Sequence, residues 1–276
     1  MHLLRLFASL LVLLAASVPA LAQVGISPAY HDLSAAEAGK TQTFRLFNYT
    51  DEAKRVRVSL APWDADPSNQ PRLLPPGPTT LDQWVVVNPV EFEVKPQSSQ
   101  AVRFSVRPAA ELPVGEQRVM FIFDEVSPPS PDGNMRARFQ FRSALYVQTG
   151  PTARKGDIES LTASTDGARV RLKNAGNANV RLMGQFAIWQ ADAFPGVEAT
   201  ALISGLGTPD AKLAHGQLIA NSLPGTPVLP GETHDITFPF GPTVLKPGRY
   251  VLDLNGKLGD AVLDRSVEFV VGAAAR

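Results

Sequence analysis

The sequence contains one strand–turn–strand pattern twice, and this repeat limits the folds that the chain can adopt. The stretch "FRLFN" (44–48) precedes a polar turn and "VRV" (56–58), and "VRLKN" (170–174) precedes a polar turn and "VRL" (180–182). Pro96 and Pro113 follow the first copy, and Pro230 and Pro247 follow the second. The separation is 17 residues in both pairs (113 − 96 = 17 and 247 − 230 = 17). Matching strands and turns at a fixed spacing predict two related β-sandwich units.

The remaining segments are typical of short strands separated by turns. Stretches such as "VNPVEFEVKP" and "DRSVEFVV" alternate apolar and polar residues, which indicates strands with one buried face. The chain has 24 prolines and 21 glycines, and its hydrophobic fraction of 44% is high enough for a packed core. We therefore expect an all-β protein with two sandwich domains, 23–150 and 151–276, divided within "QTGPTARKGD".

The first 22 residues have the pattern of a secretory signal peptide. Arg5 precedes an apolar run, and "ALA" (20–22) is a small-residue cleavage site. An uncleaved anchor is the alternative, but the run is short for a membrane-spanning helix. We expect an exported protein, and the absence of cysteine excludes disulfides and thiolate metal ligands.

The charge balance argues against two classes of partner. Removal of Arg5 leaves 26 − 1 = 25 basic residues against 26 acidic ones, a net charge of about −1. No long basic run is present, so the sequence supports neither nucleic-acid binding nor docking to an anionic membrane.

The residues that could support catalysis are scattered. His31, His215 and His234 are far apart and lack metal-ligand spacing, and no nucleophile elbow or phosphate-binding glycine loop is found. Asp64 and Asp66 could form a carboxylate pair for glycoside chemistry, but we interpret "WDADPSNQP" as an acidic loop that leaves a strand. We therefore expect no enzyme, no cofactor and no small-molecule substrate.

The stretch "NMRARFQFRSALYVQTG" (134–150) has two different faces. Met135, Ala137, Phe139 and Phe141 alternate with Arg136, Arg138, Gln140 and Arg142. Alternation with period two is typical of a β-strand with one apolar and one polar face. The apolar set could fill the core of its own sandwich, or it could be offered to another protein.

The order of motifs along the chain resembles the PapD-like periplasmic chaperones of the chaperone–usher pilus pathway. The resemblance rests on "GISPAYHDL", "FRLFNYTDEAKRVRVSLAPW", "FEVKPQSSQAVRFSVRP", "ELPVGEQRVMFIFDEV", "VRLKNAGNANVRL" and "LKPGRYVLDL". It implies two immunoglobulin-like domains around an interdomain cleft. It also implies a periplasmic protein that binds pilin-like subunits and delivers them to an outer-membrane usher.

The resemblance also implies a role for the alternating strand, since such chaperones donate a β-strand to a subunit that lacks one. Met135, Ala137, Phe139 and Phe141 are then the residues that enter the subunit groove. Each well-buried large side chain would contribute about 1.5–3 kcal/mol. The alternative class is a structural or adhesive surface protein of tandem immunoglobulin-like domains.

The chain departs from the family at the positions that usually hold a subunit carboxylate in the cleft. Alignment puts Tyr30 and Ala144 there, and neither residue is basic. The candidates for cleft contacts are Tyr30, His31, Arg138, Arg142 and Arg154.

Overall fold

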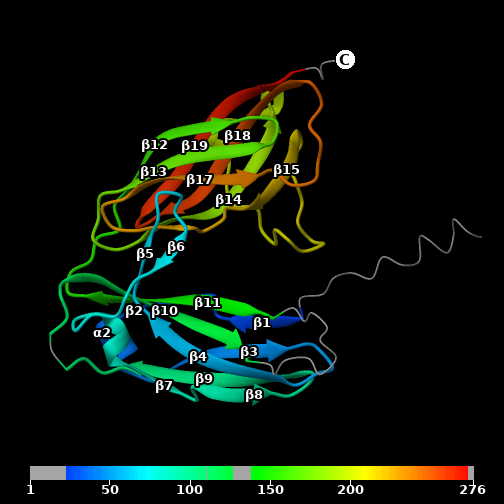
Figure 1. The fold of residues 1–276 in the computed structure, drawn as a ribbon. Helices are drawn as coiled ribbons and strands as arrows, with labels where there is room; N and C mark the ends of the chain where they lie inside the picture. The colour runs from blue at the N-terminus through cyan, green and yellow to red at the C-terminus, as the bar shows by residue number, and fades with distance from the viewer. Residues whose placement is uncertain (1–22, 110, 127–137, 273–276) are drawn as a thin grey trace, which may run out of the picture.

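The chain folds into two β-sandwiches that lie one above the other in Figure 1. The structure is a computed structural model that describes residues 23–109, 111–126 and 138–272. Strands β1 to β11 form the first sandwich, and β12 to β19 form the second. Among the described residues, no helix has both the length and the apolar character needed to cross a membrane.

The first sandwich packs a four-stranded sheet against a five-stranded sheet. The four-stranded sheet has the order β1-β3-β9-β7, and the five-stranded sheet has the order β2-β11-β10-β4-β8. The strands are β1 (Val24–Ser27), β2 (Tyr30–Ser34), β3 (Gln42–Asn48), β4 (Lys54–Ala61), β7 (Val85–Asn88), β8 (Glu91–Val94), β9 (Ser98–Val106), β10 (Gly115–Glu125) and β11 (Gln140–Thr149). This order is immunoglobulin-like, as the sequence predicted.

The core of the first sandwich is aromatic. Phe44, Phe121 and Phe123 are fully buried between the two sheets, and the rings of Phe44 and Phe121 lie 5.0 Å apart. These residues come from β3 and β10, in which every second side chain points inward. In β3 the buried residues alternate with exposed or half-buried ones, whereas β10 is buried on both faces because its other side packs in the apolar contact with Trp63 and Leu229.

The second sandwich repeats the plan with a three-stranded sheet, β12-β13-β17, and a larger sheet, β15-β14-β18-β19, to which β16 adds at β14. The strands are β12 (Gly156–Ala163), β13 (Gly167–Asn174), β14 (Val180–Gln190), β15 (Gln217–Ser222), β16 (Pro227–Val228), β17 (Thr233–Pro239), β18 (Gly248–Leu258) and β19 (Ala261–Val271). Val170, Leu172, Ile188 and Leu252 are among its fully buried residues.

The repeat seen in the sequence has a structural basis in two buried asparagines. The Asn48 side chain, at the end of β3, donates to the Val94 and Lys95 carbonyls at 3.1 Å, and its oxygen accepts from the Thr50 amide at 3.0 Å. The Asn174 side chain, at the end of β13, donates to the Ala178 and Val228 carbonyls at 2.9 Å. An amide side chain that satisfies several backbone groups can remain buried without penalty.

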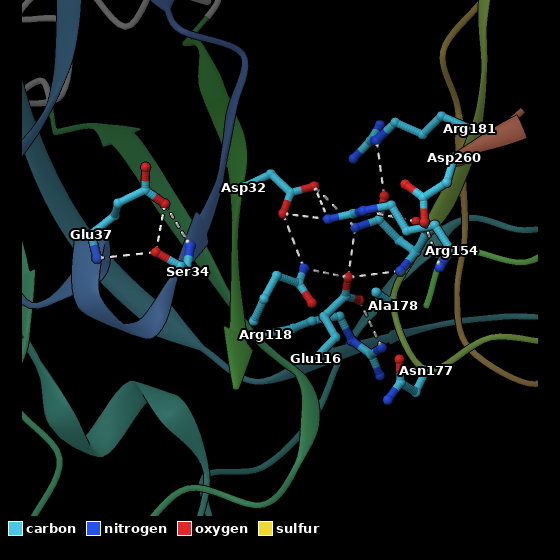
Figure 2. Close-up of polar contacts among 12 residues, drawn as sticks. Asp32, Ser34, Glu37, Glu116, Arg118, Arg154, Asn177, Ala178, Arg181 and Asp260 are labelled. Atoms are coloured by element: carbon cyan, nitrogen blue, oxygen red, sulfur yellow. Dashed lines mark hydrogen bonds and ion pairs between the residues drawn. The ribbon is translucent and has the colours of Figure 1, made fainter. Parts of the chain in front are cut away.

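Helical structure is confined to short segments. Helix α2 (Ala35–Ala38) is capped by Ser34. The Ser34 hydroxyl accepts from the Glu37 backbone amide, and the Glu37 carboxylate accepts from the Ser34 backbone amide (Figure 2). The other turns are η1 (Leu81–Trp84), η2 (Ala191–Ala193) and η3 (Val197–Ala199). None of these helical segments is longer than four residues.

A short hairpin reaches from the first sandwich toward the second (Figure 1). It consists of β5 (Trp63–Ala65) and β6 (Pro71–Leu73), and the Asn69 side chain at its turn donates to the Pro227 carbonyl at 3.0 Å. The interpretation of "WDADPSNQP" as a loop is therefore wrong in detail, because this stretch makes the turn of a hairpin. Asp64 pairs with Arg72 at 2.6 Å, and Asp66 accepts from the Ser68 and Gln70 amides.

Candidate functional site

Strand β11 has a partner along one edge and a partner along only part of the other. It pairs with β10 from Gln140 to Thr149. On its opposite edge it pairs in parallel with β2, and this pairing begins at Ala144. Among the described residues, no strand pairs with the opposite edge before Ala144. The first part of β11 therefore presents backbone groups that another strand could pair with.

This open edge arises because the N-terminal strand changes sheets. Strand β1 pairs with β3 in the four-stranded sheet, whereas β2 pairs with β11 in the five-stranded sheet. The two are separated by Pro28 and Ala29, so β2 reaches β11 only at Tyr30.

The two phenylalanines that the sequence singled out lie at the start of β11, Phe139 directly before the strand and Phe141 within its open part. Phe139 and Phe141 are half-buried, pack against the core of the first sandwich, and have ring centroids 5.2 Å apart. Their rings therefore lie at the edge of the core and are not sealed inside it. Met135 and Ala137 lie outside the described residues.

The other face of β10 and β11 forms one wall of an interdomain cleft. Met120, Ala144 and Tyr146 point to this side and pack with Trp63 of the hairpin and with Leu229 of the second sandwich. Beside this apolar contact is a hollow of about 360 Å³. Its lining includes Arg142 and Arg181 and contains no acidic residue.

Arg181, from β14 of the second sandwich, is the central cation of the cleft. Its guanidinium lies 4.0 Å from the centre of the Tyr30 ring and 5.2 Å from that of Tyr146. It donates to the Gly225 carbonyl at 2.7 Å, and no ion pair of the described residues includes it. An arginine that stacks on two tyrosines is held in place while its charge stays available to a ligand.

Burial raises the pKa of Tyr146 to about 12, so its hydroxyl stays protonated at neutral pH. The buried Trp63 indole nitrogen has no hydrogen-bond acceptor in the described structure. The lining of the hollow includes two tyrosines and two arginines, a set that suits a ligand group rich in acceptors.

A polar network holds the two sandwiches together at the rim of the cleft (Figure 2). The Arg154 guanidinium donates to both Asp32 carboxylate oxygens at 2.8 Å. The buried Glu116 carboxylate accepts from the Asn179 amide at 2.8 Å and from the Asn179 side chain at 2.6 Å. Asp32 and Glu116 belong to the first sandwich and their partners to the second, so these contacts constrain the relative position of the domains.

The structure brings some of the predicted cleft residues together and separates others. Tyr30 and Ala144 are register partners on β2 and β11, and both line the hollow together with Arg142. Arg154 lies at the rim, engaged by Asp32. Arg138 is exposed and comes before β11 begins.

His31 points away from the cleft. Its Nε2 atom lies 3.1 Å from the Thr43 carbonyl oxygen, and its ring packs 4.6 Å from that of Phe44 in the first core. Burial lowers the pKa of His31, so the ring is neutral at neutral pH. This residue therefore stabilises the sandwich and does not contribute to the cleft.

His234 and the acidic pair make local contacts. His234 lies 2.7 Å from the Glu232 carboxylate, and Asp64 and Asp66 are occupied within the hairpin. Across the part of the chain that the structure describes, no group of three or more histidine, aspartate or glutamate residues has a metal-binding arrangement.

Arg181, Trp63 and Leu229 were missed as cleft residues. "VRL" (180–182) was noted only as the second copy of the repeat, and its arginine gave no sign that it would face another domain. These three residues are far apart in the sequence, and only the docking of the two sandwiches brings them to one place.

Comparison with known proteins found similarity at the level of solved structures only. No family model and no curated protein matches the chain. Among the solved structures, the YadV chaperone is 13% identical, with 90% of this chain and 100% of that chain covered and a TM-score of 0.46. The class 5 fimbriae chaperone CfaA is 10% identical, with 90% and 98% covered and a TM-score of 0.45. A chain of the CsuC–CsuE chaperone–tip adhesion subunit complex of Acinetobacter baumannii is 14% identical, with 90% of this chain and 98% of that chain covered and a TM-score of 0.45.

Proposed function

We propose that the protein is a divergent PapD-like periplasmic chaperone that binds pilin-like subunits by donating a β-strand. The observation that carries this proposal is the open edge of β11 before Ala144, next to two half-buried phenylalanines. A subunit that lacks one strand has unpaired backbone groups and an open core, and a donor strand satisfies both.

The mechanism assigns different tasks to the backbone and the side chains of the donor segment. The free backbone groups of β11 extend the subunit sheet. Phe139 and Phe141 provide apolar surface to the subunit groove, and each would contribute about 1.5–3 kcal/mol when fully buried there. Met135 and Ala137 continue the same alternation toward the N-terminus and would lengthen the donor segment.

The cleft supplies a second contact. Arg181 and Arg142 line an acid-free hollow beside β11, so we assign them to an anionic group of the subunit. The resemblance implies the C-terminal carboxylate of the subunit in this role. Arg181 of the second domain would then replace the basic residues that are missing at Tyr30 and Ala144.

Export through the N-terminal signal and delivery of the subunit to an outer-membrane usher complete the proposal. Both follow from the sequence pattern of residues 1–22 and from the family resemblance. Binding and release need no cofactor, because the donor strand exchanges non-covalent contacts alone.

The donor role can be tested by co-expression with a pilin-like protein encoded beside this chain. We expect Phe139→Glu to abolish recovery of the soluble subunit complex, because a charged side chain cannot enter an apolar groove. Val262→Glu is the matched control, since Val262 is exposed on β19 of the other domain and should leave the yield unchanged. The thermal unfolding of each variant shows whether it is folded.

Undiminished recovery of the subunit with folded Phe139→Glu protein would overturn the donor role. The location of the complex separates the proposal from the adhesive alternative. A chaperone complex is recovered from the periplasm in soluble form, whereas a surface protein stays with the cell envelope.

The role of the cleft has its own test. We expect Arg181→Met to weaken the subunit complex at least tenfold, and Arg181→Lys to weaken it less, because lysine retains the charge. The comparison is repeated with a subunit extended by three glycines at its C-terminus. If Arg181→Met weakens native and extended subunits equally, the carboxylate assignment is wrong.

A further inference from the structure

The outer face of the four-stranded sheet in the first sandwich has a biased composition. Along β3 and β9 the outward side chains include Thr43, Arg45, Phe47, Ser99 and Arg103, while the alternate residues point into the core. We call this surface the β3–β9 face. Its two arginines are neighbours on adjacent strands, because Arg45 pairs in register with Ala101, and Thr43 with Arg103.

None of the outward positions on β3 and β9 is acidic, and the outward positions of the flanking strands β1 and β7 contain no acidic residue. On β1 they are Gly25 and Ser27, and on β7 they are Val86 and Asn88. A sheet face with two arginines and no carboxylate at its outward strand positions is open to a partner that brings acidic groups of its own.

An exposed aromatic pair adjoins the arginines. The rings of Phe47 and Tyr49 stack at 6.1 Å with an interplanar angle of 3°. Tyr49 is 56% exposed, and Val86, on the edge strand β7 of the same sheet, is also 56% exposed. Tyrosine and arginine are the residues most enriched at the energetic centres of protein interfaces.

Neither arginine has an acidic partner among the described residues. Arg45 donates to the Ser99 hydroxyl at 3.1 Å, and neither Arg45 nor Arg103 takes part in an ion pair of the described residues. On β4 of the other sheet, in contrast, Arg55 and Arg57 both pair with Glu91. The charges of Arg45 and Arg103 are therefore uncompensated within the described structure.

We propose that the β3–β9 face binds an acidic, partly apolar segment of another protein. A second copy of this chain is a poor occupant, because a symmetric contact would bring like charges together. An anionic membrane is also disfavoured, since two arginines attract it weakly and the whole chain has a net charge near zero. A protein segment can supply carboxylates for the two arginines and apolar side chains that pack on the exposed aromatic pair.

The position of the face allows it to act together with the cleft. The cleft is built on the outward side of β10 and β11, and the β3–β9 face is on the opposite side of the same sandwich. A partner on this face would not compete with a subunit in the cleft. The four strands are 4, 7, 9 and 4 residues long, so at about 4.8 Å between strands and about 3.3 Å per residue the face presents roughly 380 Å², which is the size of a transient contact.

The test uses ¹⁵N-labelled full-length exported protein and a defined probe. The probe is a ten-residue peptide in which Asp and Glu alternate with Leu and Val, and its counterpart has Lys in place of each acidic residue. We expect the acidic peptide to shift the backbone resonances of β3 and β9. We expect Arg45→Glu combined with Arg103→Glu to weaken binding at least tenfold, and Tyr49→Ser to weaken it several-fold.

The control is Arg265→Glu, which changes an exposed arginine on β19 that has no ion pair in the described structure and should alter affinity less than twofold. Equal binding of the lysine peptide, or shifts away from β3 and β9, would overturn the proposal. So would binding of phosphatidylglycerol vesicles at this face, or concentration-dependent shifts there without peptide, since these outcomes assign it to a membrane or a second copy.

Discussion

The last strands of the two sandwiches are both open at one edge, yet they differ in what they offer to another chain. Strand β19 pairs with β18 from Ala261 to Val271, and none of the described strands pairs with its outer edge. Strand β11 pairs fully with β10 and is open only before Ala144. The backbone of both strands could therefore accept a further strand.

The side chains at the two open edges are of different kinds. The exposed positions of β19 include Val262 and Val270, but Arg265 and Glu268 lie between them, and charged residues on an edge strand oppose unwanted pairing. Phe139, directly before β11, and Phe141, in its open part, place aromatic surface at the margin of the core. The comparison teaches that an open edge becomes a binding site only where the side chains also favour a guest.

The largest expected effect comes from removing the buried asparagine at the end of the equivalent strands β3 and β13, Asn48 in the first sandwich and Asn174 in the second. We expect Asn48→Ala and Asn174→Ala each to lower the free energy of unfolding of their own domain by about 3 kcal/mol, because several buried backbone groups lose their partner. Chemical denaturation followed by tryptophan fluorescence measures this. Trp63 and Trp84 report on the first domain, and Trp189 reports on the second.

Equal effects in both domains would establish that the two asparagines have the same role. A loss below about 1 kcal/mol in either domain would contradict it, since that is the value of one ordinary hydrogen bond.

The second prediction concerns Asp253, a buried carboxylate of the second sandwich with one oxygen that has no hydrogen-bond partner in the described structure. Asp253 is 1% exposed, and burial raises its pKa to about 6. Glu116 of the first sandwich, in contrast, accepts several hydrogen bonds. We expect Asp253→Asn to raise the free energy of unfolding of the second domain at pH 7.5 by about 2 kcal/mol.

The sign follows from proton linkage. The folded-state pKa of Asp253 lies above the unfolded value of about 3.9, so the folded domain loses stability as pH rises from about 4 to about 6 and is constant above that. The stabilisation by Asp253→Asn should therefore be near zero at pH 4 and complete by pH 7. A constant difference across this range in denaturation curves would contradict the assignment.

The smallest expected effect concerns the contact between the two sandwiches. Arg154→Met should reduce the free energy of unfolding by about 1 kcal/mol, because it removes a two-oxygen pairing with Asp32 in which both side chains are 23% exposed. Arg249→Met is the control, since its pair with Glu268 is exposed and should contribute less than about 0.5 kcal/mol. Equal losses in the two variants would show that the interdomain pair adds nothing.

The fold was largely predictable because its determinants are local in the sequence. Alternation in "FRLFN" and "VRLKN" set the inward faces of β3 and β13, and their terminal asparagines marked equivalent turns. The same alternation identified Phe139 and Phe141 but could not show which edge of β11 is open. That edge depends on where β2 joins β11, which is a pairing between segments more than one hundred residues apart.

The cleft was less predictable for a related reason. Arg181 faces Tyr30 only because the second sandwich docks on the first, and no period or spacing in either segment encodes that contact. His31 was expected near the cleft from its place beside Tyr30. Adjacent residues of a strand point to opposite faces, so when Tyr30 faces the cleft, His31 enters the core.

Hydrogen–deuterium exchange of the protein, free and with the pilin-like subunit that we propose it binds, tests the central claim most directly. In the free protein we expect rapid exchange in residues 138–143, because their outer edge has no partner in the described structure. In the complex with the pilin-like subunit, exchange in this segment should slow at least tenfold while β19 stays unchanged. Unaltered exchange in residues 138–143, or protection that appears at Ala261–Val271 instead, would contradict donation of a strand by β11.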